Sequence, residues 1–589
     1  MRKTHIILYV LLIVFFKGTG QHIIQNEREL DGLKAIPKET IYLHFNDNLL
    51  LAGEPLYYAI YCLTSEKYTY SNISKIAYVE LVNEERQAIF RHKIKLNSGT
   101  GYGDFLIPND IASGNYKLLG YTRWMLNTTN DTFFQADLKI INPYLELPDA
   151  TKVVEADTLG IGGLTTETLS APTDQNRMPF RIILTQKKYG KRSALDLRIE
   201  NSATTEGSYS LSIRKKYPAA VKPKNNPLNF LTDKASPDQW NLAEKDTVYL
   251  PELRGELITG QLSGDSGSPS EGSRHISLSI PGTENSVLKV VKTDEHGKFN
   301  FILDDSYRYS DAYLQVLGKQ DTLLQWTNTT NPTGIYKNLD FETLSIQEDI
   351  LTEIQQRSIY NQIEQAFYEQ KADILITELT PLSVHEELDE VYLLDDYTRF
   401  PTLKETIVEI VDDVMIRRIG GDQVFQIRAE GEFFIDSKDR PLVLVDGLLV
   451  EDLQALLDFG ARNIEKISLS KQNYYIGPQL FQGIISFKTF NNQYLSLIGN
   501  DHNELWRLGR PLPKKRYFNQ LYSEDVEETQ KHLPDFRNQL LWEPKLSLDQ
   551  KSTAIPCYSS DNSGTYEIIL QGFTKKGKPV FLEEVFEVE

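Results

Sequence analysis

The chain of 589 residues is long enough for several domains of a typical size of about 150 residues. Hydrophobic residues make up 40% of it and charged residues 25%, so every domain can bury a core. The formal net charge of −19 excludes a nucleic-acid partner, because a surface of this charge cannot neutralise a row of phosphates.

The N-terminus has the pattern of a secretory signal peptide. Arg2 and Lys3 precede the short apolar run 6–16, and small residues follow it. We expect residues 1–20 to be the signal peptide, with cleavage near Gly20. An uncleaved anchor helix is the alternative, which the short run disfavours. No Cys stands directly after the run and no later run is long enough to span a membrane, so we expect an exported protein without lipid anchor or membrane span.

Residues 21–145 are predicted to form an antiparallel β-sandwich, because short aromatic-rich segments with alternating polarity are separated by turn residues. Gly53 marks a turn before one strand, and Gly114 opens another. The stretches around these glycines resemble the macroglobulin-type (MG2) domain. Residues 146–178 are rich in Thr, Gly, Ser and Ala and are predicted to be a linker.

Two further sandwiches are predicted next, over residues 179–245 and 246–330. The second resembles the carboxypeptidase-regulatory-like domain, a seven-stranded prealbumin-like sandwich, in the glycines of its first strand and in the sequence Thr-Asp-Glu-His-Gly-Lys-Phe. That sequence predicts a hairpin whose turn is capped by Asp294 and needs a positive φ at Gly297. The resemblance implies a domain without catalytic activity.

A helical connector is predicted over residues 331–395. Its apolar side chains recur at helical spacing at Ile350, Ile354, Ile359 and Ile363, so we expect them to pack on neighbouring parts of the chain. Docking of a partner on this helix is the alternative.

Residues 396–492 are predicted to form a small α/β domain. Asp446-Gly447 indicates a tight turn between apolar strands, a short helix follows, and Gly477 and Gly483 precede a last strand. This order resembles the plug domain of TonB-dependent outer-membrane receptors. The chain departs from that family in having no clear TonB-binding box and too few following residues for a receptor barrel, so we expect no transmembrane barrel. Residues 493–589 are predicted to form a last β-sandwich.

No catalytic, cofactor-binding or metal-ligating residue is predicted. The histidines are scattered, and His385 lies in an acidic run without the two-histidine zinc spacing. Neither Cys62 nor Cys557 belongs to a zinc or thioester motif. We interpret both as buried small side chains, and a disulfide between them stays open. We therefore expect a protein that is not an enzyme.

The combination of domains resembles a family of exported Bacteroidota envelope proteins whose plug-like domain has no barrel of its own. The resemblance implies a mainly β, multidomain subunit at the outer membrane, on its external or periplasmic side. It would bind a barrel protein or complex for TonB-dependent (SusCD-like) transport or for outer-membrane protein assembly or secretion. A free ligand-binding module for glycans or proteins, and an enzyme of unidentified type, are the alternatives.

Possible interface residues are predicted in the plug-like segment, where aromatic side chains can anchor a partner. Packing within the domain core is the alternative for the same side chains. The residues are Asp446, Gly447, Tyr474, Tyr475 and Phe481.

Overall fold

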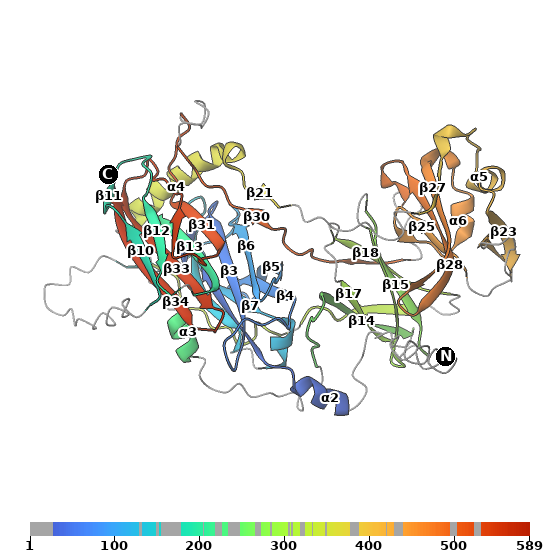
Figure 1. Ribbon diagram of the computed structural model, residues 1–589, viewed down its shortest axis with the longest axis horizontal. Coiled ribbons are helices and arrows are strands. Elements are labelled where there is room, and N and C mark those ends of the chain that lie inside the picture. Colours follow the sequence, from blue (N-terminus) through green and yellow to red (C-terminus); the bar gives the residue numbers. More distant parts are fainter. Residues whose placement is uncertain are drawn as a thin grey trace, which may run out of the picture. The chain divides into compact units, whose positions relative to one another are not determined.

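The computed structural model shows a mainly β, multidomain protein, which confirms the predicted fold class (Figure 1). It divides into two compact units: unit 1 contains residues 1–34, 255–332 and 379–510, and unit 2 the remainder. The residues described are 27–128, 132–148, 152–154, 178–203, 205–217, 226–233, 248–264, 272–282, 286–303, 307, 310–318, 324–332, 334–347, 350–376, 388–419, 421–428, 440–494, 503–522 and 532–589. The predicted signal peptide lies outside them.

Unit 2 begins with a sandwich of two sheets around a continuous buried core. Rings such as Tyr42 and Phe134 pack edge to face in this core. A three-stranded sheet has the order β1 (Glu39–Phe45), β3 (Pro55–Thr64) and β6 (Thr100–Leu106). A five-stranded sheet has the order β2 (Leu49–Leu51), β8 (Phe134–Ile141), β7 (Gly114–Tyr121), β4 (Ile76–Val82) and β5 (Ala88–Lys95).

The second sandwich of unit 2 differs from the predicted arrangement. Segments 179–245 and 493–589, expected to form separate sandwiches, contribute strands to the same two sheets. One sheet is β10 (Phe180–Leu184), β12 (Leu197–Asn201) and β32 (Ser552–Ile555). The other is β11 (Lys188–Tyr189), β34 (Pro579–Val588), β33 (Gly564–Thr574), β13 (Gly207–Lys215) and β31 (Gln539–Leu546). The alternation within each strand reveals its buried face but not a partner more than 300 residues away.

The two sandwiches of unit 2 share a buried polar interface. The Tyr42 hydroxyl donates to Gln571 at 2.5 Å, and the Tyr61 hydroxyl donates to Ser210 at 2.7 Å. His44 Nδ1 also lies 2.5 Å from the Ser210 hydroxyl. These groups are buried, so hydrogen bonding among them compensates for their removal from water.

Helix α4 (Ile350–Ala366) confirms the predicted helix, but its buried stripe is mostly polar. Ile354, Arg357, Ser358 and Asn361 are buried, whereas Ile359 is 47% exposed. The stripe faces the loop before β3, where acidic side chains and backbone carbonyls need donors. The predicted range 331–395 is not one connector, because β20 (Ser345–Gln347) pairs with β9 (Lys152–Val154) in unit 2, and β21 (Ile374–Leu375) pairs with β30 (Lys515–Arg516).

Unit 1 contains a seven-stranded sandwich that one distant strand, β29, completes. The sheets are β17 (Lys298–Leu303), β14 (Glu256–Gly264) and β19 (Leu324–Asn328), and β16 (Val287–Lys292), β15 (His275–Ile280), β18 (Asp311–Val316) and β29 (Glu504–Arg507). The Asp294 carboxylate accepts hydrogen bonds from two following backbone amides, and Gly297 has φ 74°, as predicted. The flanking strands lie in different sheets, however, so the turn joins the two sheets and is not a hairpin.

The α/β domain of unit 1 is built on a five-stranded sheet of order β22 (Glu390–Leu393), β27 (Ile464–Ile476), β28 (Gln479–Thr489), β25 (Leu442–Val445) and β26 (Leu448–Leu449). Helices α5 (Leu403–Ile410) and α6 (Leu453–Leu457) pack on the same core. A separate ribbon pairs β23 (Val414–Ile419) with β24 (Asp422–Ile427). Asp446 and Gly447 have φ of 52° and 83°, which confirms the predicted tight turn.

The remaining α-helices of the described residues are α2 (Glu27–Lys34) and α3 (Pro227–Asp233). In the part of the chain described, no helix combines the length and apolar character needed to cross a membrane.

Candidate docking groove of unit 1

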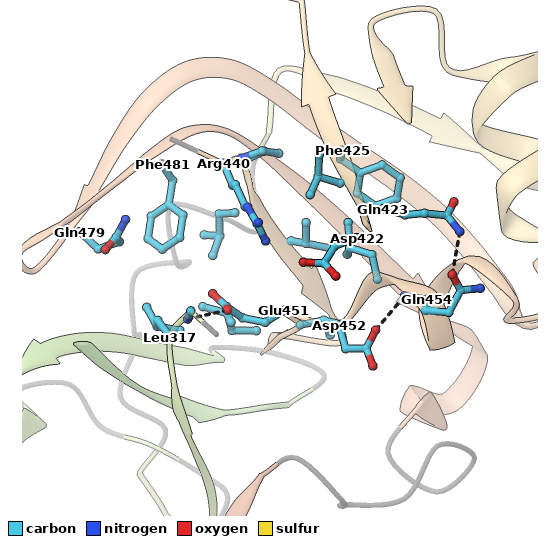
Figure 2. A pocket seen from close by; sticks show the side chains of 18 of the residues that line it. Leu317, Asp422, Gln423, Phe425, Arg440, Glu451, Asp452, Gln454, Gln479 and Phe481 are labelled. Atoms are coloured by element: carbon cyan, nitrogen blue, oxygen red, sulfur yellow. Dashed lines mark hydrogen bonds between the residues drawn. The ribbon is translucent and has the colours of Figure 1, made fainter. Parts of the chain in front are cut away.

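A groove with a volume of about 710 Å³ lies between the β23–β24 ribbon, the five-stranded sheet and one end of the sandwich (Figure 2). All its walls belong to unit 1. The ribbon contributes residues 421–425, and the chain entering β25 contributes residues 440–443. The other walls come from residues 449–454, from Gln479 and Phe481, and from His275, Leu317 and Gly318 of the sandwich.

The walls of the groove are apolar at their base. Leu442, Val443, Leu449 and Phe481 are buried, as is Phe425 on the ribbon. These side chains belong to two hydrophobic clusters, one mainly in the α/β domain and one shared with Leu288 and Val290 of the sandwich. The base of the groove is therefore held by packed cores.

Charged side chains surround this apolar base, and acidic groups outnumber basic ones. Three carboxylates, those of Asp422, Glu451 and Asp452, and one guanidinium, that of Arg440, line the groove. Figure 2 shows Asp422, Glu451 and Arg440 directed into the same space. The groove therefore favours a cationic over an anionic occupant.

Glu451 is held in place by the sandwich. Its Oε2 accepts a hydrogen bond of 2.8 Å from the backbone amide of Gly318. Burial raises the pKa of Glu451 above its usual value, while the Gly318 amide and the Arg440 charge oppose this rise. A carboxylate that is partly removed from water gains more from a cationic partner than an exposed one does.

Hydrogen bonds order the side of the groove formed by α6. Asp452 is the N-cap of this helix and accepts from the Gln454 amide at 2.9 Å. The Gln454 side chain accepts from Gln423 of the ribbon at 2.7 Å and donates to Asp458 at 2.8 Å. The ribbon is thereby tied to the helix across one end of the groove.

Strand β24 presents a backbone edge to the groove. Among the described residues its hydrogen-bonded neighbour is β23 on one side, and consecutive residues Asp422 to Phe425 line the groove on the other. Peptide groups at such an edge can pair with an added extended segment.

Asp446 and Gly447, two of the predicted interface residues, lie inside unit 1. The Asp446 carboxylate accepts from the Thr489 amide at 2.8 Å, the Thr489 hydroxyl at 2.6 Å and the Tyr494 amide at 3.3 Å. Burial raises its pKa, which these hydrogen bonds oppose. A Cβ on Gly447 would lie 2.5 Å from the Ser286 Cβ, so the turn packs directly against the sandwich.

The other three predicted residues lie on the β27–β28 hairpin. Phe481 is buried and is the only one of the five that lines the groove. The Tyr474 hydroxyl lies 3.1 Å from the Ser470 hydroxyl, and its ring packs on the cluster shared with the sandwich. Tyr475 is 76% exposed. As contacts to another protein, these residues stay a prediction.

Sequence reasoning missed the charged groove residues Asp422, Arg440, Glu451 and Asp452. Glu451-Asp452 directly follows the apolar strands of the Asp446-Gly447 turn, which was a usable signal. Asp422 and Arg440 belong to segments whose approach to that turn depends on the tertiary structure.

Cys62 and Cys557 are both free and buried in unit 2, as expected for small core side chains. Burial raises the pKa of the Cys557 thiol to about 12 and that of Cys62 far above its usual value. In the described ranges no three His, Cys, Asp or Glu side chains are grouped so that they could hold a metal ion.

Comparison with known proteins gives structural neighbours of low similarity. No protein-family model matches the chain, and no curated protein matches it significantly. The alignment with elastase-activated α2-macroglobulin from Escherichia coli covers 94% of this chain and 44% of that protein, at 7% identity and a TM-score of 0.24. The alignment with methylamine-reacted Salmonella α2-macroglobulin covers 93% of this chain and 39% of that protein, at 8% identity and a TM-score of 0.23.

The alignment with dimeric latent PorU from Porphyromonas gingivalis covers 53% of this chain and 34% of that protein, at 8% identity and a TM-score of 0.14. The chain therefore spans less than half the length of each of these proteins. At such TM-scores the likeness carries no argument about activity or partners.

Proposed function

We propose that this chain is an exported, non-enzymatic subunit of an outer-membrane-associated complex. In this proposal it acts through protein–protein contacts, and the groove of unit 1 receives an extended segment of a partner. The partner is an outer-membrane barrel protein or complex of transport, or of outer-membrane protein assembly or secretion. The signal-peptide pattern and the resemblance of the α/β domain to receptor plugs support this location and this class of partner.

The observation that carries the proposal is the combination, in one groove, of an apolar base with a strand edge that has no pairing strand among the described residues. An extended segment paired with β24 would satisfy its own peptide groups and those of the strand. Alternate side chains of the segment would then point toward Phe425, Leu442 and Phe481, which line the base.

The charge of the groove specifies the segment further. With three carboxylates and one guanidinium, the groove fits a segment that carries a Lys or Arg side chain. Glu451 is the preferred contact because it is already partly desolvated and fixed by Gly318. Asp422 is exposed and gives a second contact at the edge strand.

Native co-purification tests the proposal. The chain is tagged at its C-terminus, the envelope is solubilised in mild detergent, and the eluate is analysed by mass spectrometry. We expect a stoichiometric outer-membrane protein with the wild type, and its loss with Asp422→Lys. Asp396→Lys is the control, because it makes the same charge change at an exposed position that does not line the groove.

Elution of the wild type alone, from the soluble fraction, would contradict the proposal and favour the free ligand-binding module. Equal recovery of the partner with both variants would show a complex that does not use the groove.

A further inference from the structure

A second groove, with a volume of about 460 Å³, lies between helix α5 and the β23–β24 ribbon. It belongs entirely to the α/β domain of unit 1. The ribbon separates it from the docking groove described above, and Gln423 contributes to both. We call it the basic groove because of the side chains that line it, which are Lys404, Val408, Asp412, Val414, Met415, Ile416, Arg417, Arg418, Gln423 and Arg428.

The charge of the basic groove is opposite to that of the whole chain. Four cationic side chains and one carboxylate line it, whereas the chain has a net charge of −19. Lys404 and Arg418 are exposed, so their charges can be reached by a ligand in solution. Concentrating positive charge on one face of an acidic protein produces a local field that selects anionic partners.

Carboxylates among the described residues around this groove offset its positive charge only in part. Asp413 lies beside the groove. Its carboxylate oxygens lie 2.6 Å from the Lys471 Nζ and 3.6 Å from the Arg428 Nε. Asp412 is the single acidic side chain in the lining. Glu405 of α5 instead caps its own helix, where its carboxylate accepts from the Thr402 amide at 3.2 Å.

The local fold explains why cationic and apolar side chains meet here. Helix α5 buries Leu403, Thr406 and Ile407 in the domain core. Lys404 and Val408, four residues apart, therefore share its outer stripe. Val408 is 63% exposed, and Ile416 and Met415 of β23 are half-buried, so the cationic rim surrounds an apolar base.

We infer that the basic groove binds an acidic protein segment that also carries an apolar side chain. Its carboxylates would pair with Lys404 and Arg418, and its apolar side chain would cover Val408. An anionic membrane surface shares the charge requirement, but the lining forms a groove between a helix and a strand, and this shape suits a protein segment.

The inference does not depend on the docking groove, which has the opposite charge and lies on the other side of the ribbon. Loss of binding in one groove is therefore distinguishable from loss in the other. A partner that uses both would present a basic and an acidic segment on either side of β24.

Fluorescence anisotropy with a defined probe tests the inference. The probe is a short labelled peptide that alternates glutamate with leucine, and the comparison peptide has glutamine in place of glutamate. The full-length chain should bind the glutamate peptide, and the affinity should fall as salt is raised. Arg418→Glu, at an exposed position, should weaken binding at least about tenfold, which is about 1.4 kcal/mol.

Two further variants separate a specific groove from general charge attraction. Arg507→Glu makes the same charge change at an exposed position of unit 1 outside the groove, and it should leave the affinity within about twofold. Val408→Asp should weaken binding because it places a carboxylate on the apolar base. Circular dichroism confirms the fold of each variant.

Equal affinity for the glutamate and glutamine peptides, or equal losses with Arg418→Glu and Arg507→Glu, would overturn the inference. Binding to vesicles containing anionic lipid without binding to the glutamate peptide would also overturn it and assign the groove to a membrane surface.

Discussion

The buried contact between α4 and the first sandwich makes Arg357 the most informative stability probe in unit 2. Its guanidinium is buried and donates to Glu54 at 2.6 and 2.7 Å, to Asp47 at 3.3 Å and to the Leu49 carbonyl at 3.0 Å. It also lies 4.6 Å from the centroid of the Tyr217 ring. These contacts hold the pKa of Arg357 above its usual value, although burial alone would lower it.

Replacing Arg357 with Met keeps much of the side-chain volume and removes the charge. Glu54 then remains as a buried carboxylate without its cation, because its other contacts are the Leu51 amide at 2.9 Å and the Asn538 side chain at 3.5 Å. Asp47 retains Arg214 as a partner. Removal of one partner from a buried ion pair costs about 3–5 kcal/mol, and we expect a loss in that range.

Urea unfolding followed by tryptophan fluorescence measures this loss, since Trp542 is buried in unit 2. Gln355→Ala, on the exposed side of α4, is the control and should change the free energy of unfolding by less than about 0.5 kcal/mol. The double variant Arg357→Met with Glu54→Gln should recover about 1–3 kcal/mol, because neither charge is then buried alone. A loss below about 1 kcal/mol with Arg357→Met, or no recovery in the double variant, would show that Glu54 does not depend on the Arg357 charge.

Three further predictions concern buried groups. Burial, aided by the Arg214 charge, lowers the pKa of His44 from 6.5 to about 3. The stability that neutral His44 contributes is therefore fully present above pH 6.5 and is lost as the pH falls toward 3. At pH 5 the loss in the free energy of unfolding is about 2 kcal/mol. We expect the free energy of unfolding in urea to fall less for His44→Asn than for the wild type when the pH is lowered from above 6.5 to 5. Equal losses in the two proteins would contradict this. Asp446→Ala should lower the free energy of unfolding by about 2–3 kcal/mol, because buried donors of Thr489 lose their acceptor. An unchanged stability in thermal unfolding would contradict this. Gly447→Ala should destabilise unit 1, since Gly447 has φ 83° and its Cβ would meet Ser286 at 2.5 Å; an unchanged melting temperature would refute the close packing.

Local structure was predictable where a few neighbouring residues determine it. Asp446-Gly447 forms the expected turn because both residues adopt positive φ, and residues 350–366 form the expected helix. The buried face of that helix was not predictable from its isoleucines. Arg357 and Asn361 are buried because acidic groups and carbonyls of a loop 300 residues away need donors, and periodicity does not contain that information.

Domain assignment was limited in the same way. The chain leaves each sandwich and returns to it much later, so β13 lies between β31 and β33, and β29 completes a sandwich begun at β14. A sequence read in order divides such a sandwich into separate domains. The groove of unit 1 was missed for the same reason, since Asp422, Arg440 and Glu451 approach one another only in the folded unit.

Site-specific photo-crosslinking in living cells can test the proposal that the groove of unit 1 holds a segment of an outer-membrane partner. A photoreactive amino acid is placed at Asp422 in the groove, with Gln355 on the exposed side of α4 as the control position. The account predicts one crosslinked adduct with an outer-membrane protein from position 422, which disappears when Glu451 is replaced by Lys, and no such adduct from position 355. No adduct from position 422, or an adduct that persists with Glu451→Lys, would contradict it.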